Sequence, residues 1–272
     1  IIITASHNPR NWNALKLLNN KGEFINAKDG EKLLKIANSN HSYKYDSKNI
    51  GEVEFKNQYI DTHTDLIINL PLVDADLIRS RNFKVVVDAV NSTGGIAVPN
   101  LLNKLGVEVV KLYCDPNGEF PHNPEPLKEN LTDLSKLVIK EQADFGIVVD
   151  PDVDRLAFVS ENGEVFGEEY TLVACADYFL KNKPGITVSN LSSSRALKDI
   201  TESYGCEYFS SAVGEVNVVE KMKEKNAVIG GEGNGGIILP ELHYGRDALV
   251  GIALFLTHLS KLNISCSDLR KK

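Results

Sequence analysis

The sequence predicts an α/β protein with mainly parallel sheets, and three observations support this prediction. Apolar runs that are typical of buried strands alternate with amphipathic segments along the 272 residues. Two of these runs, Lys84–Asp88 and Phe145–Val149, lead into polar loops that contain glycine or aspartate. Residues 57–163 and 164–272 each repeat the order of strand, loop and helix. We therefore expect three units, with residues 1–56 forming the first.

The first unit is predicted to contain two strands, a helix and a loop. The strands are short apolar runs, a turn at residues 20–22 follows the second of them, and the helix has apolar side chains at helical spacing. In chain order these elements are Ile1–Ile3, Asn13–Asn19, Ala27–Asn38 and the polar stretch Ser39–Gly51.

The second and third units are predicted from the same patterns, with β-branched runs as strands and periodic segments as helices. In the second unit we expect helix Gln58–Ile68, strand Lys84–Asp88, a Gly94–Gly95 turn, helix Ile96–Leu105, strand Val107–Leu112, loop Pro116–Pro126, helix Leu127–Gln142, strand Phe145–Val149 and a hairpin of Leu156–Ser160 with Val165–Phe166. In the third we expect helix Glu169–Leu180, strand Ile186–Asn190, helices Arg195–Tyr204 and Val216–Glu224, strand Ala227–Ile229 and a long apolar helix from Asp247.

Composition narrows the classes of partner. The net charge of −7 provides no basic surface for nucleic acid or anionic lipid, so we expect a small molecule or protein as partner. The longest apolar run, Ala248–Leu256, is shorter than the roughly 20 residues of a membrane span. The 4 cysteines form no CxxC pair, which favours reduced thiols and a cytoplasmic location.

Three carboxylates at alternate positions follow the predicted strand Phe145–Val149. Asp150, Asp152 and Asp154 can converge on one hard cation such as Mg²⁺, Ca²⁺ or Mn²⁺. An EF-hand calcium loop is a second interpretation, but Arg155 stands where that loop requires glycine. A solvated acidic turn is the third, and mutual repulsion of the carboxylates weakens it.

The hexapeptide TASHNP, residues 4–9, places Ser6 beside His7 in a predicted strand-to-loop turn. Such a serine can be a nucleophile, although neighbouring side chains on a strand point to opposite faces. A plain loop with helix-capping residues is the alternative, and no GxSxG motif suggests a hydrolase triad.

The glycine-rich segment of residues 231–236 follows another predicted strand and presents Glu232 and Asn234. Both side chains can accept hydrogen bonds from sugar hydroxyls, and a flexible hairpin turn is the alternative interpretation. We expect His41, His63 and His258, which show no metal-ligand spacing, to be surface or core histidines.

In their order along the chain, TASHNP, DxDxDR and the GEGNGG loop resemble the α-D-phosphohexomutase family of phosphoglucomutases, phosphomannomutases and phosphoglucosamine mutases. The similarity also covers NALK, VVVDAVNSTGG, FPHNPEP and AVGEVNVVEKM. It implies tandem α/β domains with mixed, mainly parallel sheets and helices on both faces. It also implies transfer of a phosphoryl group between O1 and O6 of a hexose phosphate through a 1,6-bisphosphate.

The resemblance implies a role for each matching residue. Ser6 would be the phosphoserine, with His7 beside it, and its phosphate would share Mg²⁺ with Asp150, Asp152 and Asp154. Arg155 would steady that phosphate, and Lys16 would be the general acid/base. Glu232 and Asn234 would bind sugar hydroxyls.

Two departures from the family pattern concern loops of this site. Pro151 and Val153 replace glycines of the usual DGDGDR loop, which stiffens the loop and keeps its ligands. Gly236 stands where some members have a substrate histidine, so we expect His243 or Arg246 to take its role.

The resemblance also implies a four-domain protein, of which this chain would be a fragment that starts within the first domain and stops at the end of the third. We expect the chain alone to be nearly inactive as a mutase, because a phosphate clamp from the fourth domain would be missing. A phosphoglucosamine mutase and a catalytically silent sugar-phosphate-binding protein are the alternatives to a phosphoglucomutase/phosphomannomutase. A phosphatase with an aspartate nucleophile is disfavoured by Pro151.

Overall fold

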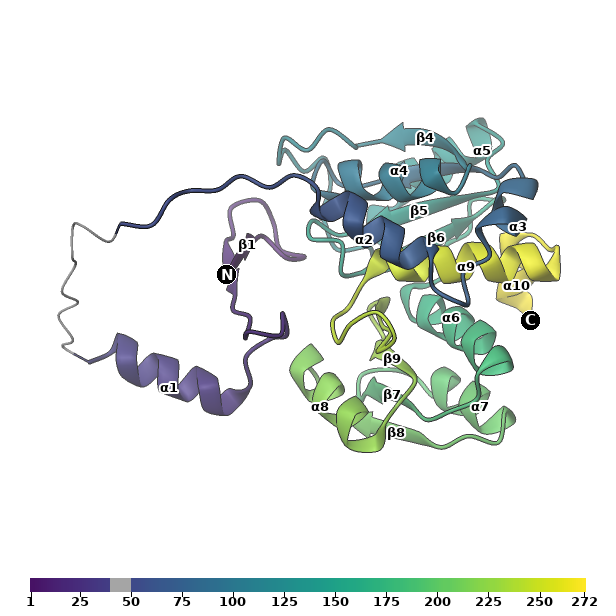
Figure 1. Ribbon diagram of the computed structural model, residues 1–272. Helices are drawn as coiled ribbons and strands as arrows, with labels where there is room; N and C mark the ends of the chain where they lie inside the picture. Colours follow the sequence, from purple (N-terminus) through teal and green to yellow (C-terminus); the bar gives the residue numbers. More distant parts are fainter. Residues whose placement is uncertain (40–49) are drawn as a thin grey trace.

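The computed structural model describes residues 1–39 and 50–272, and it contains three sheets. The first is a two-stranded ribbon of β1 (Ile2–Thr4) and β2 (Ala14–Lys16), antiparallel with Ile2 opposite Lys16. Helix α1 (Ala27–Ala37) follows and begins at the Asn26 cap. All of its residues are exposed or half-buried, and it stands beside the rest of the molecule (Figure 1).

The second sheet has the strand order β4–β3–β5–β6. Strands β3 (Lys84–Asp88), β4 (Glu108–Leu112) and β5 (Phe145–Val149) are parallel, and β6 (Leu156–Ser160) is antiparallel to β5. Alternation along β3 sends Val85 and Val87 into the larger core, on the side of α4 (Gly94–Lys104), and Val86 against α5 (Thr132–Lys140). Helices therefore cover both faces of this sheet.

The third sheet has the order β10–β9–β7–β8. Its strands are β7 (Thr187–Asn190), β8 (Tyr208–Ser211), β9 (Ile229–Glu232) and β10 (Gly236–Ile238), with only the β9–β10 pair antiparallel. It packs with α6 (Glu168–Asn182), α7 (Ala196–Ser203) and α8 (Glu215–Lys225). These mixed, mainly parallel sheets with covering helices confirm the predicted fold class.

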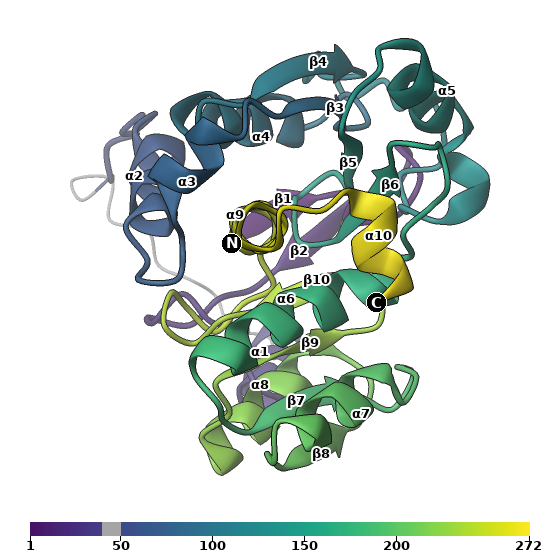
Figure 2. The ribbon, with the colours of Figure 1, turned by 90° about the vertical axis from the view of Figure 1, so that its right-hand side faces the viewer.

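Helix α9 (Ala248–Leu262) joins the second and third units. It lies between the two larger sheets, and every residue from Ala248 to Ser260 is buried (Figure 2). It packs against α6, against α2 (Tyr59–Ile68) and against α3 (Ala75–Ser80). The Phe255 ring stacks on Phe158 of β6 with 3.8 Å between ring centroids. Among the described residues, no helix combines the length and apolarity needed to span a membrane.

The structure differs from the sequence-based elements at short segments. Strands β8 and β10 and helices α3 and α10 (Cys266–Lys271) were not predicted, because runs of three to six residues carry too few repeats to show a period. The Gly94–Gly95 pair opens α4 instead of forming a turn before it. The predicted helix over residues 127–142 is split into a 3-10 turn (Lys128–Asn130) and α5, and Val165 forms a single bridge to Val159. The expected loop at Ser39–Gly51 falls almost wholly, and His41 entirely, outside the described residues.

Because the Phe255 ring stacks on Phe158 in the core, we expect Phe255→Ala to lower the free energy of unfolding strongly. Phe255 is 0% exposed and contacts three other rings, so truncation leaves a cavity and should lower the free energy of unfolding by about 3–5 kcal/mol. Phe55→Ala is the matched control, because Phe55 is 88% exposed and its loss should change stability by less than about 0.5 kcal/mol. Urea unfolding of both variants measures the difference, and equal stabilities would contradict this role for α9.

Candidate functional site

Ser6 lies in a tight turn that directly follows β1. Its φ of 51° is in the left-handed region, which residues other than glycine rarely adopt. The Thr4 hydroxyl accepts a hydrogen bond from the Ser6 N–H at 2.8 Å and donates to Asp152 Oδ2 at 3.0 Å. Ser6 Oγ is 3.2 Å from His7 Nδ1. The threonine therefore connects the serine turn to the aspartate loop.

Lys16 reaches the same aspartates from the neighbouring strand β2. Its Nζ is 2.6 Å from Asp152 Oδ2 and 2.7 Å from Asp154 Oδ2. Burial lowers the pKa of Lys16, but the two carboxylates outweigh burial and hold the pKa above its ordinary value. In this arrangement Lys16 is protonated at neutral pH.

The three aspartates follow β5 at the carboxyl end of the second sheet. Asp150 Oδ1 accepts the backbone N–H groups of Asp154 and Arg155, each at 3.0 Å, and so shapes the loop. Val153 has a φ of 62°, a conformation that is strained for a β-branched residue. Val153 thus adopts a left-handed conformation where the usual motif has glycine, and carboxylate oxygens of all three aspartates lie within 4.8 Å of one another.

The remaining oxygens of these carboxylates fit a cation. Within the described residues, one buried oxygen of each aspartate has no hydrogen-bond partner: Asp150 Oδ2, Asp152 Oδ1 and Asp154 Oδ1. Burial, with the charges of Asp154 and Asp152, raises the pKa of Asp150 well above its ordinary value. Buried carboxylates that repel each other and lack partners are suited to a hard divalent ion.

Arg155 lies beside this loop with its side chain almost fully buried. Its guanidinium forms an ion pair with Glu125 of the proline-rich loop, and its Nε has no hydrogen-bond partner among the described residues. Burial, followed by the charge of Arg155, lowers the pKa of His7. Arg155 is therefore held by one partner and keeps a free donor.

The glycine-rich segment forms the hairpin between β9 and β10. Gly235 has a φ of 83°, and a Cβ there would lie 1.9 Å from the Leu156 carbonyl oxygen, so only glycine fits. Glu232 is buried and accepts hydrogen bonds from Asn190 Nδ2 at 2.9 Å and from the Gly214 N–H at 3.2 Å. Asn234 Nδ2 makes a longer contact of 3.4 Å with Glu232 Oε2.

Arg246 joins the hairpin to the aspartate loop. Its guanidinium contacts Glu232 Oε2 at 2.7 Å, Asp154 Oδ2 at 2.7 Å and Glu215 Oε2 at 2.9 Å. The four side chains are each 10% exposed or less. Burial raises the pKa of Glu215, and Arg246 partly offsets this. Arg246 was predicted from the sequence as a substrate ligand, whereas its contact with Asp154 was not predicted.

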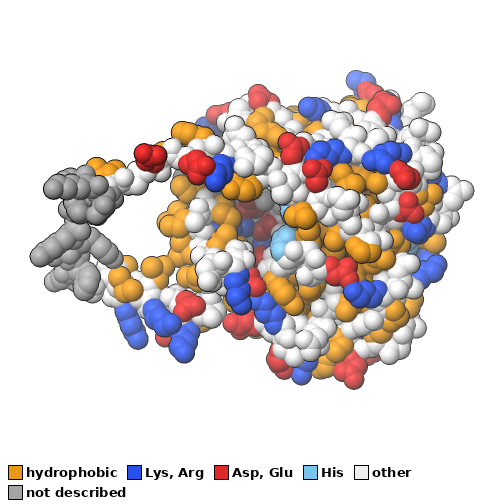
Figure 3. Space-filling view, viewed as in Figure 1, with side chains coloured by type: hydrophobic (Ala, Val, Ile, Leu, Met, Phe, Trp, Pro, Cys, Tyr) orange, Lys and Arg blue, Asp and Glu red, His pale blue; other side chains and the backbone are white. Residues whose placement is uncertain are grey.

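Part of this site lines a cavity of about 210 Å³ between the β1–β2 ribbon and the third unit, whereas Ser6, Arg155 and Glu232 do not line it. In the space-filling view, acidic and basic side chains and a histidine gather around the hollow (Figure 3). Members of the lining that carry functional groups are Lys16, Asp152, Asp154, Glu215, His243 and Arg246.

The structure brings most of the predicted site residues together, and it adds some that were missed. Thr4, Glu125 and Glu215 were not predicted; Glu125 and Glu215 lie in FPHNPEP and AVGEVNVV, whose similarity to the family could have drawn attention to them. His243 lines the cavity, but its ring contacts Asp247, together with His63. His63 has no metal-ligand spacing in the sequence, but the fold brings it to Asp247 and His243, about 180 residues away, in a group of side chains that could hold a metal ion. His258 is a buried histidine, as expected.

Comparisons with known proteins show similarity to one family along most of the chain. Residues 1–44, 57–163 and 167–272 match the family models of phosphoglucomutase/phosphomannomutase alpha/beta/alpha domains I, II and III, respectively. A phosphoglucomutase/phosphomannomutase of Thermococcus kodakarensis is 35% identical over 270 residues, covering 98% of this chain and 59% of that protein. A protein of Methanopyrus kandleri named probable phosphoglucosamine mutase is 32% identical over 272 residues, covering 99% of this chain and 59% of its own.

Among solved structures, a phosphoglucomutase/phosphomannomutase family protein of Burkholderia thailandensis superimposes with a TM-score of 0.79 at 26% identity. The match covers 99% of this chain and 57% of that one. The chain thus spans less than two thirds of the length of these relatives.

The sheets and the convergence of their loops define a protein of the phosphohexomutase type. The chain belongs to the phosphoglucomutase/phosphomannomutase family, which confirms the resemblance found in the sequence.

The contacts of Arg246 lead us to expect that its positive charge contributes to the free energy of unfolding. Arg246→Met leaves Asp154, Glu215 and Glu232 buried around a missing cation and should lower the free energy of unfolding by about 3–5 kcal/mol. The loss should shrink as the pH falls, because the raised pKa of Glu215 lets this carboxyl take up a proton.

Arg195→Met is the control, because Arg195 forms an exposed pair with Asp199 whose loss should cost less than about 1 kcal/mol. Urea unfolding at two pH values tests both variants. A similar, pH-independent cost in each would show that Arg246 does not compensate the buried acids.

Proposed function

We propose that this chain carries the phosphoryl-transfer centre of a phosphohexomutase of the phosphoglucomutase/phosphomannomutase type. The observation that carries the proposal is the trio of partnerless carboxylate oxygens on Asp150, Asp152 and Asp154, joined through Thr4 to the Ser6 turn. A cation-binding loop and a serine in one centre are the parts that transfer from a phosphoserine requires.

In this proposal, Ser6 Oγ carries the phosphoryl group and the three aspartates hold Mg²⁺. The ion, when bound, neutralises charge on the transferred phosphoryl oxygens. A hexose hydroxyl attacks phosphorus, the bond from phosphorus to Ser6 Oγ breaks, and a hexose 1,6-bisphosphate forms. Ser6 Oγ then attacks the other phosphate of the turned sugar, which returns a phosphoryl group to the serine and releases the isomeric hexose phosphate.

The protein groups around Ser6 have distinct proposed roles. Lys16 is held protonated by Asp152 and Asp154, so it can give a proton to the leaving oxygen and recover one from the attacking hydroxyl. Arg155 has a free Nε with which to hold the phosphate, while Glu125 fixes its orientation. His7, with its lowered pKa, is a neutral neighbour of Ser6.

In this proposal, the β9–β10 hairpin and Arg246 bind the sugar hydroxyls. Glu232 already accepts short hydrogen bonds from Asn190 and Arg246, so a sugar hydroxyl would replace its long 3.4 Å contact with Asn234. The freed Asn234 amide could then bind a second hydroxyl. A glucosamine phosphate remains the alternative substrate, because relatives of similar identity carry both kinds of name.

Phosphorylation of Ser6 tests the proposal. Incubating the chain with glucose 1,6-bisphosphate and Mg²⁺ should add one phosphoryl group, seen by intact mass and located on Ser6 by peptide mapping. Ser6→Ala and Asp152→Asn should abolish the uptake, whereas Ser80→Ala, at an exposed serine, should leave it unchanged.

Glucose-1-, mannose-1- or glucosamine-1-phosphate should then remove the group, and the fastest sugar identifies the substrate class. Uptake that persists in Ser6→Ala contradicts the mechanism. Sugar-phosphate binding without any uptake identifies a catalytically silent protein.

The position of His243 leads us to expect that it contributes to the discharge of phosphoserine by hexose phosphate. Because its ring lines the cavity with Lys16 and Arg246, His243→Ala should slow the discharge of phosphoserine by hexose phosphate about 10-fold, the value of one hydrogen bond. His243→Gln should recover part of the rate, since its amide can also donate. Single-turnover measurements at saturating sugar phosphate provide the comparison, and an unchanged rate would remove His243 from the substrate site.

A further inference from the structure

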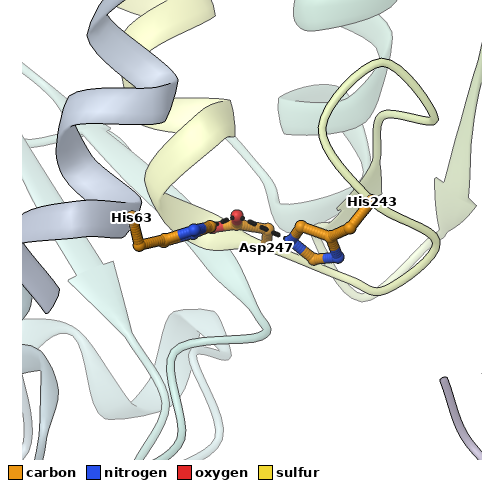
Figure 4. Close-up of side chains that lie close together, drawn as sticks. All are labelled: His63, His243 and Asp247. Atoms are coloured by element: carbon orange, nitrogen blue, oxygen red, sulfur yellow. Dashed lines mark hydrogen bonds and ion pairs between the residues drawn. The ribbon is translucent and has the colours of Figure 1, made fainter. Parts of the chain in front are cut away.

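A second group of metal-ligand side chains lies outside the aspartate loop. His63 projects from α2, His243 lies in the loop after β10, and Asp247 stands at the start of α9 (Figure 4). Asp247 Oδ2 is 2.7 Å from His63 Nε2 and 3.1 Å from His243 Nε2. The imidazole rings are 5.7 Å apart and inclined at 50°, so both point at one oxygen without stacking.

The two oxygens of Asp247 have separate partners. Oδ1 caps α9 by accepting the N–H groups of Leu249 at 2.8 Å and Val250 at 3.3 Å. Oδ2 faces only the imidazole side of the cluster, and the residue is 6% exposed. Ligation through Oδ2 would therefore leave the helix cap intact.

The spacing of the three ligand atoms suits a small divalent cation. All of them lie within 4.8 Å of one another. Bonds of about 2.0–2.2 Å in a tetrahedron separate ligand atoms by about 3.3 Å, so the two contacts of Asp247 Oδ2 need to widen by about 0.6 Å for His63 and about 0.2 Å for His243. The side chains of His63 and His243 are 31% and 42% exposed, which provides an entry path and room for a water as fourth ligand.

We propose that His63, His243 and Asp247 form a binding site for one zinc-class divalent cation. Two imidazole nitrogens with one carboxylate select zinc and neighbouring transition metals over Mg²⁺, whose preferred ligands are all oxygen. On binding, each neutral imidazole that carries its proton on Nε2 moves it to Nδ1, so that Nε2 can coordinate. The site shares no ligand with the aspartate triad.

An ion bound at this cluster would link two parts of the chain. It connects α2 of the second unit to residues 243–247 of the third, and Arg246 lies within that loop. A cation here would hold the Arg246 backbone in place from outside the cavity. It would also occupy His243, which lines the cavity.

Zinc binding by the chain in the presence of excess Mg²⁺, which fills the aspartate triad, tests the proposal. Equilibrium dialysis with elemental analysis should find one bound Zn²⁺ per chain, and calorimetry gives its affinity. Co²⁺ as a second probe should show the visible absorption of a low-coordinate site with nitrogen ligands. His63→Gln and His243→Gln should each weaken Zn²⁺ binding at least about 10-fold.

Glutamine at position 63 can still donate a hydrogen bond to Asp247, so these variants separate ligation from folding, and thermal unfolding checks that they are folded. Asp150→Asn controls for the aspartate triad. His122→Gln controls for another histidine–aspartate pair, with His122 Nε2 at 3.0 Å from Asp88. Both controls should retain one Zn²⁺. No bound zinc, equal affinity in His63→Gln, or loss in either control would show that the cluster is only hydrogen-bonded.

Discussion

The contacts of the Arg246 guanidinium with three buried carboxylates are the interaction on which the rest of the site depends. Asp154 comes from the second sheet, Glu232 from the third, and Glu215 from the start of α8. Without a cation between them, these acids would repel one another in a region of low dielectric. One side chain therefore joins the aspartate loop to the glycine-rich hairpin.

Helix α9 places this arginine, because Arg246 directly precedes the Asp247 cap. Burial of α9 between the two larger sheets determines where its first turn lies, and the Phe158–Phe255 stack fixes it against β6. The Ala248 N–H also donates to the Val153 carbonyl oxygen at 3.1 Å, which joins the helix start to the aspartate loop. Core packing and site geometry are thus consequences of the same helix.

The sequence predicted those features that are encoded locally. Strands β3 and β5 are built on continuous apolar runs, and the alternation of the aspartates that follow β5 indicated a cation site, with an EF-hand loop and a solvated acidic turn as alternatives. The serine turn was identified mainly from its resemblance to a family. By contrast, the Arg246–Asp154 and His63–Asp247 contacts join residues that are distant in sequence, so no spacing in the chain could reveal them. The domain boundaries and the roles of the site residues stay predictions.

The aspartate loop accommodates Val153 at a position where the usual family motif has glycine. Val153 adopts a left-handed conformation that costs of order 1–3 kcal/mol for such a residue and persists only where the surroundings enforce it. Here Asp150 Oδ1 enforces it by accepting two backbone N–H groups, while Oδ2 stays without a partner. Asp247 divides its oxygens in the same way between a helix cap and two imidazoles. In both places one oxygen of a buried carboxylate builds the backbone and the other faces a possible cation, so cation binding requires little rearrangement of the chain.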